Sequence, residues 1–232
     1  MPTPFQPARR AGLLAGLLAA LDARAQVPPT ERERAAWSPL HEAAWRGDTE
    51  ALRRLLAQRP DLAARDGHGR TALHVATYAR RHDAIRLLAA AGADLGALEH
   101  DRYDAVTIAA VADDEPTLAL LLELGASAKL VTSRYDGTAL IAAAHLGHDG
   151  VVRRLIAAGA PLDHVNNLHW TALIEAIVLG DGGPRHQACV DALLKAGAST
   201  QLADRSGRTP LQLAEARGYA AMARRLREAG AR

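Results

Sequence analysis

Aromatic side chains are scarce in this sequence, and cysteine is nearly absent. One Phe, three Trp and four Tyr make up 3% of the 232 residues, although 49% of the residues are hydrophobic. Because globular cores usually depend on aromatic bulk, an apolar content dominated by Ala and Leu favours closely packed helices. The single cysteine, Cys189, excludes an intramolecular disulfide, and its apolar neighbours predict a buried side chain rather than a reactive thiol. The composition predicts an all-α fold.

Strong net charge and long apolar runs are also missing. The formal net charge is +2, which provides no strong field toward nucleic acid or anionic lipid. No segment reaches the roughly 18 consecutive apolar residues that a membrane-spanning helix requires. We therefore expect no nucleic-acid partner and no membrane span.

Motifs of known catalytic chemistry are missing as well. The sequence contains no HExxH, no paired CxxC and no GxSxG. Five of its ten His residues fall within one stretch, at His145, His148, His164, His169 and His186. The i, i+3 spacing of the first two suits some metal ligands, but they fall where the repeat described below expects polar helix ends. We predict no enzyme, no cofactor and no metal site; a metal-dependent hydrolase is the disfavoured alternative.

The amino-terminal segment admits two interpretations. Arg9 and Arg10 precede an uncharged apolar run over residues 11–21, and an Ala-x-Ala sequence ends at Ala25. This order is typical of a cleaved signal peptide over residues 1–25, which would export the protein to the periplasm. The Leu residues of the run also fit one face of a helix that covers the first repeat of a cytoplasmic protein. Residues 26–35 are expected to form a short exposed linker. The Leu residues are Leu13, Leu14, Leu17, Leu18 and Leu21.

From residue 36 onward, a short motif returns at nearly constant intervals. A clear copy is Thr-Ala-Leu-His at residues 71–74, and successive copies are 33, 33, 34, 33 and 38 residues apart. A second mark, Gly followed by Ala, ends five of the units in the same phase. Two marks in one phase predict a solenoid of repeated units. The motif occupies residues 38–41, 71–74, 104–107, 138–141, 171–174 and 209–212, and the Gly residues are Gly92, Gly125, Gly159, Gly197 and Gly230.

These residues resemble the ankyrin repeat, whose 33-residue unit is a β-turn followed by two antiparallel helices. The resemblance covers residues 36–232 and implies about six units, near residues 36–68, 69–101, 102–135, 136–168, 169–206 and 207–232. Thr at the motif start can cap the first helix, and Gly suits a turn with φ > 0 after the second helix. His41 and His74 resemble the motif histidine that ties neighbouring turns together. Adjacent Leu pairs in the second helices are expected to form the core.

The family implies a protein-interaction scaffold, with turns that project as fingers along one rim of a groove. We predict a monomer that binds an unidentified protein through this groove and the fingers; the rival is a structural or protective factor with many partners. Arg-Tyr-Asp occurs at residues 102–104 and 134–136, and Asn-Asn-Leu-His-Trp at 166–170. These aromatics either contact a partner or pack across neighbouring fingers to stiffen them. The predicted contacts are Arg102, Tyr103, Arg134, Tyr135, Asn167, His169 and Trp170.

Two segments depart from the repeat. Asp-Asp-Glu-Pro at residues 113–116 is expected to cap the second helix of the third unit, with a cation or basic-peptide site as the alternative. Residues 180–186 account for the 38-residue interval. They are expected to enlarge the loop between the helices of the fifth unit, either for partner contact or as a tolerated surface loop.

Overall fold

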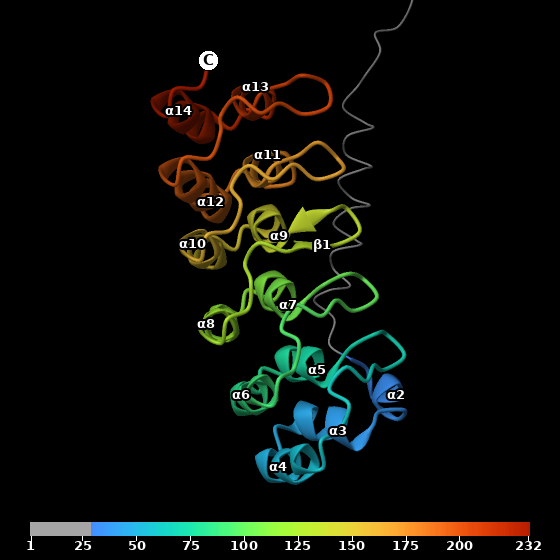
Figure 1. Cartoon of the computed structure of the whole chain (residues 1–232). Helices are drawn as coiled ribbons and strands as arrows, with labels where there is room; N and C mark the ends of the chain where they lie inside the picture. Colours follow the sequence, from blue (N-terminus) through green and yellow to red (C-terminus); the bar gives the residue numbers. More distant parts are fainter. Residues whose placement is uncertain (1–28) are drawn as a thin grey trace, which may run out of the picture.

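The protein is an array of helix pairs stacked side by side (Figure 1). The computed structural model describes residues 29–232, so the two interpretations of residues 1–25 lie outside the described part. Each pair, here called units 1 to 6, has an inner helix next to the projecting turns and an outer helix behind it. The inner helices are α3 (Pro39–Arg46), α5 (Ala72–Tyr78), α7 (Ala105–Val111), α9 (Ala139–Leu146), α11 (Ala172–Val178) and α13 (Pro210–Ala216). The outer helices are α4 (Thr49–Ala57), α6 (His82–Ala90), α8 (Glu115–Glu123), α10 (Asp149–Ala157), α12 (Pro184–Lys195) and α14 (Ala220–Glu228).

The helix boundaries follow the residues that the repeat supplies. Thr138, Thr171 and Thr209 each accept a hydrogen bond from the backbone N–H three residues later, which caps the inner helix. The Gly residues after the outer helices have φ between 78° and 95°, as predicted. Outside helices, the described residues contain one short antiparallel pair, β1 (Val131–Thr132) and β2 (Gly137–Thr138), which leads into α9. The predicted all-α solenoid is confirmed.

The motif histidines connect neighbouring units. His41 Nε2 lies 3.0 Å from the Arg70 carbonyl oxygen, and His74 Nε2 lies 2.9 Å from that of Ala97. Both rings are buried, and burial lowers the pKa of His74 to about 4. The predicted structural role of these two side chains is confirmed.

The core is built from one member of each Leu pair rather than from both. Neighbouring residues on a helix point about 100° apart, so only one can face the inner helix. The fully buried members are at most 1% exposed, and their neighbours in the pairs are only partly buried. In unit 1 neither Leu55 nor Leu56 is fully buried, and Leu52 fills that place. The fully buried members are Leu88, Leu121, Leu155 and Leu193.

Part of the segment that was expected to be a linker is helical. Residues 31–34 form the single turn α2 (Glu31–Arg34), which begins with a capping box. Thr30 N–H donates to Glu33 Oε2 at 2.8 Å, and Glu33 N–H donates to Thr30 Oγ1 at 3.3 Å. Glu33 also lies 3.4 Å from Arg70 and 2.8 Å from His68, in the turn between units 1 and 2. The Thr-x-x-Glu pattern and these ion pairs fix the helical turn against the array.

The acidic segment at residues 113–116 caps a helix, as predicted. Asp114 Oδ1 accepts the Thr117 N–H at 3.2 Å, and Asp114 Oδ2 accepts the Thr117 hydroxyl at 2.7 Å, at the start of α8. The segment also pairs with a cationic side chain of the same chain: Arg185 Nη2 lies 2.8 Å from Asp113 Oδ2.

The extra residues of unit 5 lengthen a helix as well as a loop. α12 has 12 residues and begins at Pro184, whereas α10 has nine, so the expectation of a larger loop was only partly right. Arg185 on α12 reaches Asp113 of unit 3 and also Asp149 of unit 4, with Nε 3.3 Å from Oδ1. Burial alone would raise the pKa of Asp149, but hydrogen bonds from Arg153 and Arg185 lower it overall. The insertion therefore connects three units.

Candidate binding surface

Five turns between consecutive units share one construction and are called fingers 1 to 5 here. In each, the side chain of the first residue accepts backbone N–H groups from within the turn. In finger 4, Asn166 Oδ1 accepts from Leu168 and Trp170, each at 3.0 Å. Asp66, Ser133 and Asp204 bond in the same way to the third and fifth residues, and Glu99 bonds to the fifth, Tyr103. The fingers are residues 66–70, 99–103, 133–137, 166–170 and 204–208.

The fourth residue of every finger has left-handed backbone. Fingers 1 and 5 place Gly there, at φ 75° and 74°. Fingers 2, 3 and 4 instead place Arg102, Asp136 and His169, at φ 66°, 52° and 63°. A residue with a side chain costs roughly 1 kcal/mol or more in this conformation. The three central fingers therefore keep exposed side chains at strained positions.

Backbone hydrogen bonds join one finger to the next. His100 N–H donates to the His68 carbonyl at 3.0 Å, Ser133 N–H to that of Arg102 at 3.1 Å, and Asn167 N–H to that of Tyr135 at 2.9 Å. Finger 5 is joined by a side chain, because Arg205 Nη2 donates to the Asn167 carbonyl at 2.8 Å. The fingers, which are the loops opposite the outer helices in Figure 1, form one connected edge.

Four of the predicted contact residues lie exposed on this edge: Arg102, Arg134, Asn167 and His169. Arg102 Nε donates to the Ser133 carbonyl at 3.2 Å, and the guanidinium of Arg134 pairs with Asp101. Asn167 Nδ2 donates to the Arg134 carbonyl at 3.2 Å. These side chains support neighbouring fingers and still present polar surface to solvent.

The three predicted aromatic residues lie deeper. Tyr103 is 6% exposed and packs with Ile108 and Val111, while Tyr135 and Trp170 are partly buried. The two Arg-Tyr-Asp tripeptides are not equivalent, since Tyr103 is the fifth residue of its finger and Tyr135 the third. Both tyrosines line one hollow of about 20 Å³ between the fingers and the inner helices. Of the two roles predicted for these aromatics, the contacts of Tyr103 in the described structure support packing.

The inner helices of units 2 to 4 contribute apolar side chains to a second, smaller cluster. Ile108 and Val111 of α7 are each 1% exposed and belong to a cluster separate from the main core. Tyr78, Ala142 and Leu146, each partly buried, pack against this cluster. We call these five residues the apolar strip. The members of this strip recur just after the motif in successive units, but the sequence alone did not single them out.

A buried polar group lies next to the strip in unit 5. Glu175 on α11 is 5% exposed. Asn166 Nδ2 donates to its Oε1 at 2.8 Å, and His145 Nδ1 lies 3.5 Å from its Oε2. Because a buried carboxylate is costly without compensating contacts, these neighbours stabilise it. Glu175, Asn166 and His145 thus form a buried polar group beside the apolar strip.

Comparison with known proteins agrees with this architecture. The family model described as "Ankyrin repeats (3 copies)" matches residues 12–99 and 106–204. The chain belongs to the ankyrin repeat family. The ankyrin repeat protein YahD of Escherichia coli (strain K12) is 44% identical over 100 residues, which are 43% of this chain and 50% of that protein. The chain therefore aligns with only half the length of this curated relative.

Two solved structures extend the likeness to most of the chain. An ankyrin repeat domain from Acinetobacter baumannii AYE is 46% identical, with a TM-score of 0.79 over 84% of this chain and 98% of that one. The ankyrin repeat domain of Bcl-3 is 29% identical, with a TM-score of 0.75 over 84% of this chain and 87% of that one. The resemblance stated from the motifs is confirmed.

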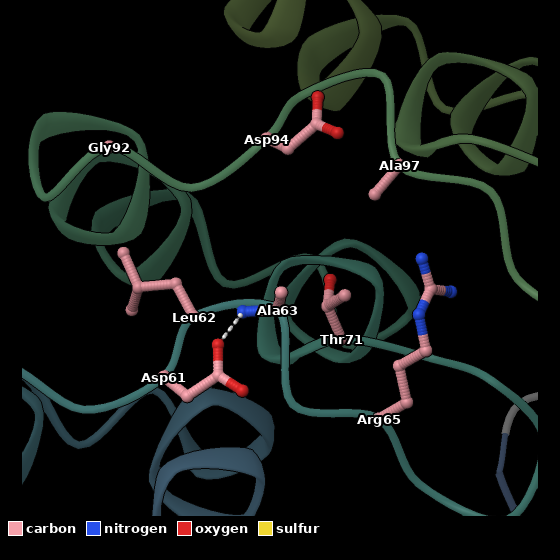
Figure 2. Close-up of a pocket in the computed structure, with 8 residues that line it drawn as sticks. All are labelled: Asp61, Leu62, Ala63, Arg65, Thr71, Gly92, Asp94 and Ala97. Atoms are coloured by element: carbon pink, nitrogen blue, oxygen red, sulfur yellow. Dashed lines mark hydrogen bonds between the residues drawn. The ribbon is translucent and has the colours of Figure 1, made fainter.

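A hollow of about 240 Å³ lies between units 1 and 2 of the ankyrin array (Figure 2). Its charged lining groups have partners within the chain. Asp61 and Asp94 each accept a backbone N–H from two residues later, at 2.9 Å. Arg65 donates to the Gly69 and Leu98 carbonyls, at 2.7 and 2.5 Å. These contacts are typical of stacked loops rather than of a ligand site.

The histidines that suggested a metal site have separate structural partners. His148 Nδ1 lies 2.9 Å from the Ala110 carbonyl oxygen, and His164 Nε2 lies 2.6 Å from that of Asp136. His186 contacts the Asp181 carboxylate at 2.8 Å and the His145 carbonyl at 2.9 Å. Within residues 29–232, no cluster of three or more His, Cys, Asp or Glu is placed to hold a metal ion. Over the same residues, no helix has the length and apolar character to span a membrane.

Proposed function

We propose that this ankyrin repeat protein is a non-catalytic scaffold that binds a protein partner through its fingertips and groove. Ankyrin repeats generally mediate protein–protein interaction. The observation that carries the proposal here is the left-handed backbone of Arg102 and His169. Both side chains are exposed, and they occupy the finger position where fingers 1 and 5 have Gly. Strained residues of this kind concentrate at functional sites, including those that hold ligands.

The connected fingers support binding by rigid complementarity. Each finger is held by its own first side chain and by its neighbour, as described above. Binding to such an edge orders little chain, so less of the interaction free energy is lost on association. We therefore propose that the partner binds the preformed edge over fingers 2 to 4.

The charges at the fingertips indicate the chemistry of the partner. Arg102 and Arg205 donate hydrogen bonds to backbone carbonyls of neighbouring fingers, and within residues 29–232 neither guanidinium has an acidic partner. Arg also provides bidentate contacts to carboxylates. We propose a partner surface that presents Asp or Glu side chains opposite fingers 2 to 5.

Affinity capture with matched variants tests this function. Immobilised chains would be wild type, a double variant with Arg102→Gly and His169→Gly, and the control Arg86→Ala on the exposed face of α6. The double variant removes both fingertips and relieves the backbone, so it should remain folded. We expect a protein retained by wild type and by the control, and lost with the double variant. Equal retention on all three would refute the assignment.

The rival function, a protective factor with many partners, predicts a different mutational pattern. Single Ala substitutions at Arg102, Arg134, Asn167 and His169 separate the two, because a specific binder loses its partner with one or two changes. A promiscuous factor would lose its bound proteins gradually, with no dominant position.

A further inference from the structure

The small hollow between fingers 2 to 4 and the inner helices α9 and α11 has a negative charge in its wall. Its volume is about 20 Å³, and it is partly open to solvent. Glu175 is the one charged residue among the described residues that line it, and no Arg, Lys or His belongs to the lining. Tyr103 and Tyr135 add two aromatic side chains. An acidic group and aromatic rings around one space are the features of a cation site.

Glu175 is an exception within the repeat. It occupies the first position after the motif, where the inner helices of units 2, 3, 4 and 6 have apolar residues. Unit 1 has Glu42 there, but Glu42 pairs with Arg46 in the first unit of the array. A carboxylate that is 5% exposed is costly to bury, and such departures from a local rule are expected at functional sites. The apolar residues are Val75, Ile108, Ala142 and Leu213.

We propose that the hollow binds the primary ammonium group of a Lys side chain of the partner, with the Glu175 carboxylate as its counter-ion. This inference rests on the proposed function and deepens it, because it names a second feature of the partner besides its acidic side chains. A Lys ammonium is a compact cation with three hydrogen-bond donors on a flexible stem. The carboxylate supplies acceptors, and aromatic rings such as those of Tyr103 and Tyr135 attract cations.

The size of the hollow selects this cation. A volume of about 20 Å³ holds roughly one water-sized group, because one water requires about 10–15 Å³ by the same measure. A Lys ammonium is of this size, whereas the planar guanidinium of Arg is larger. A divalent metal would need more ligands, and within residues 29–232 no three His, Cys, Asp or Glu side chains lie together to bind one.

Contacts within the chain hold the Glu175 carboxylate in position. Asn166 Oδ1 accepts the backbone N–H groups of Leu168 and Trp170, which orients the side-chain amide of finger 4. Its Nδ2 then donates to Glu175 Oε1 at 2.8 Å, and His145 Nδ1 lies 3.5 Å from Oε2. A carboxylate has about four acceptor positions, so it can accept from several donors at once. The same finger therefore carries the exposed fingertip and fixes the charge in the hollow.

Titration with small lysine probes tests the hollow by itself. The probe is N-acetyl-lysine N-methylamide. Of its two analogues, the norleucine compound lacks the ammonium, and the ε-trimethyl compound carries the same charge on a larger group. Binding is followed at pH 7.5 by ¹⁵N–¹H NMR of the Asn166 side-chain amide, which contacts Glu175. We expect saturable shifts with the lysine probe and at least about tenfold weaker binding of both analogues.

Three variants locate the bound probe. Glu175→Gln removes the charge and keeps an oxygen that can accept from Asn166, and Ala142→Val fills the hollow with the residue that unit 2 has at the same position. Glu42→Gln is the matched control, since it removes one charge from the same position of unit 1, outside the hollow.

The first two variants should each weaken binding of the lysine probe at least about tenfold, with an unchanged circular dichroism spectrum, and the control should not. Three results would overturn the proposal: no saturable shift in wild type, equal binding of either analogue, or insensitivity to both Glu175→Gln and Ala142→Val.

Partner capture separates this site from the fingertips. Glu175→Gln should retain at least about tenfold less partner than wild type or Glu42→Gln, and equal retention would exclude a lysine contact in the hollow. The fingertip variant with Arg102→Gly and His169→Gly leaves the hollow unchanged and should bind the lysine probe as wild type does. Equal partner capture by the fingertip variant, together with normal probe binding, would refute the fingertip site and leave the hollow intact.

Discussion

His74 should make the stability of this protein fall as the pH is lowered. The ring is 1% exposed, and burial lowers its pKa to about 4. The hydrogen bond that Nδ1 accepts also favours the neutral ring, whereas the hydrogen bond to the Ala97 carbonyl raises the pKa and opposes part of the effect of burial. The Thr71 N–H donates to Nδ1 at 3.0 Å, so the proton must reside on Nε2, which donates to the Ala97 carbonyl at 2.9 Å. Protonation of Nδ1 would remove the acceptor that Thr71 uses.

The magnitude follows from the difference in proton affinity between the folded and unfolded states. Above about pH 6.5, both states are neutral at His74 and the residue adds no pH dependence. Between about pH 6.5 and 4, the unfolded state takes up a proton that the folded state excludes, so the free energy of unfolding decreases. At about 1.4 kcal/mol per pKa unit, the loss is roughly 2–3 kcal/mol at pH 4.5 and roughly 3–4 kcal/mol when complete.

A control variant is available from the chain itself. Gln212 occupies the same motif position in unit 6 and accepts the Thr209 N–H at 3.0 Å. His74→Gln therefore keeps this acceptor but does not titrate. In urea unfolding at pH 7.5 and 4.5, the stability advantage of wild type over the variant should shrink by roughly 2–3 kcal/mol. An NMR titration of the His74 ring should give a midpoint near pH 4. A pH-independent difference between the two proteins would refute the reasoning.

Three further outcomes follow from burial and charge. Leu121→Ala should lower the free energy of unfolding by roughly 2–5 kcal/mol and the neighbouring Leu122→Ala by clearly less, measured by urea denaturation; equal losses would contradict the described core. Burial raises the pKa of the Cys189 thiol to about 12, so Ellman's reagent at pH 8 should react with it only after unfolding, and rapid reaction in the native protein would contradict this. Arg185→Met should cost at most about 1 kcal/mol at low salt and less at high salt, because the side chain is half exposed; a loss insensitive to salt would exclude the ion pairs as its cause.

Much of the fold was predictable because the repeat encodes it several times over. Capping residues, turn glycines and motif histidines act over a few residues or between adjacent units, so their spacing alone locates them. His41 and His74 behave as the motif predicts because their partners are always the carbonyls of the next turn. The Leu pairs were less informative, since choosing Leu121 over Leu122 requires the rotation of the helix about its own axis.

The candidate surface was only partly predictable. Arg102 and His169 were predicted as contact residues from their residue types. Their strained backbone could not be predicted, because it depends on the conformation of the whole finger. Tyr103 was predicted as a contact residue because it lies in an Arg-Tyr-Asp tripeptide. As the fifth residue of its finger, however, it packs against Ile108. The apolar strip could not be predicted from single units, because residues such as Val111 and Ala142 form a cluster only when the units stack. Arg185 contacts a residue 72 positions away, which no local pattern predicts.

The departures from the repeat concentrate in units 3 to 5, and they act on one another. Arg185 projects from the insertion of unit 5 and pairs with Asp113 of unit 3 and Asp149 of unit 4. Because these pairs lie at the turns between inner and outer helices, they restrict the angle between the units that carry Arg102, Asp136 and His169. A solenoid held only by neighbour contacts could flex at each interface, which would change the spacing of the fingertips. The insertion therefore stiffens the array where the strained side chains lie, and Arg185→Met should weaken partner capture even though Arg185 is remote from the fingertips. If capture by that variant equals capture by wild type, the stiffening has no part in binding.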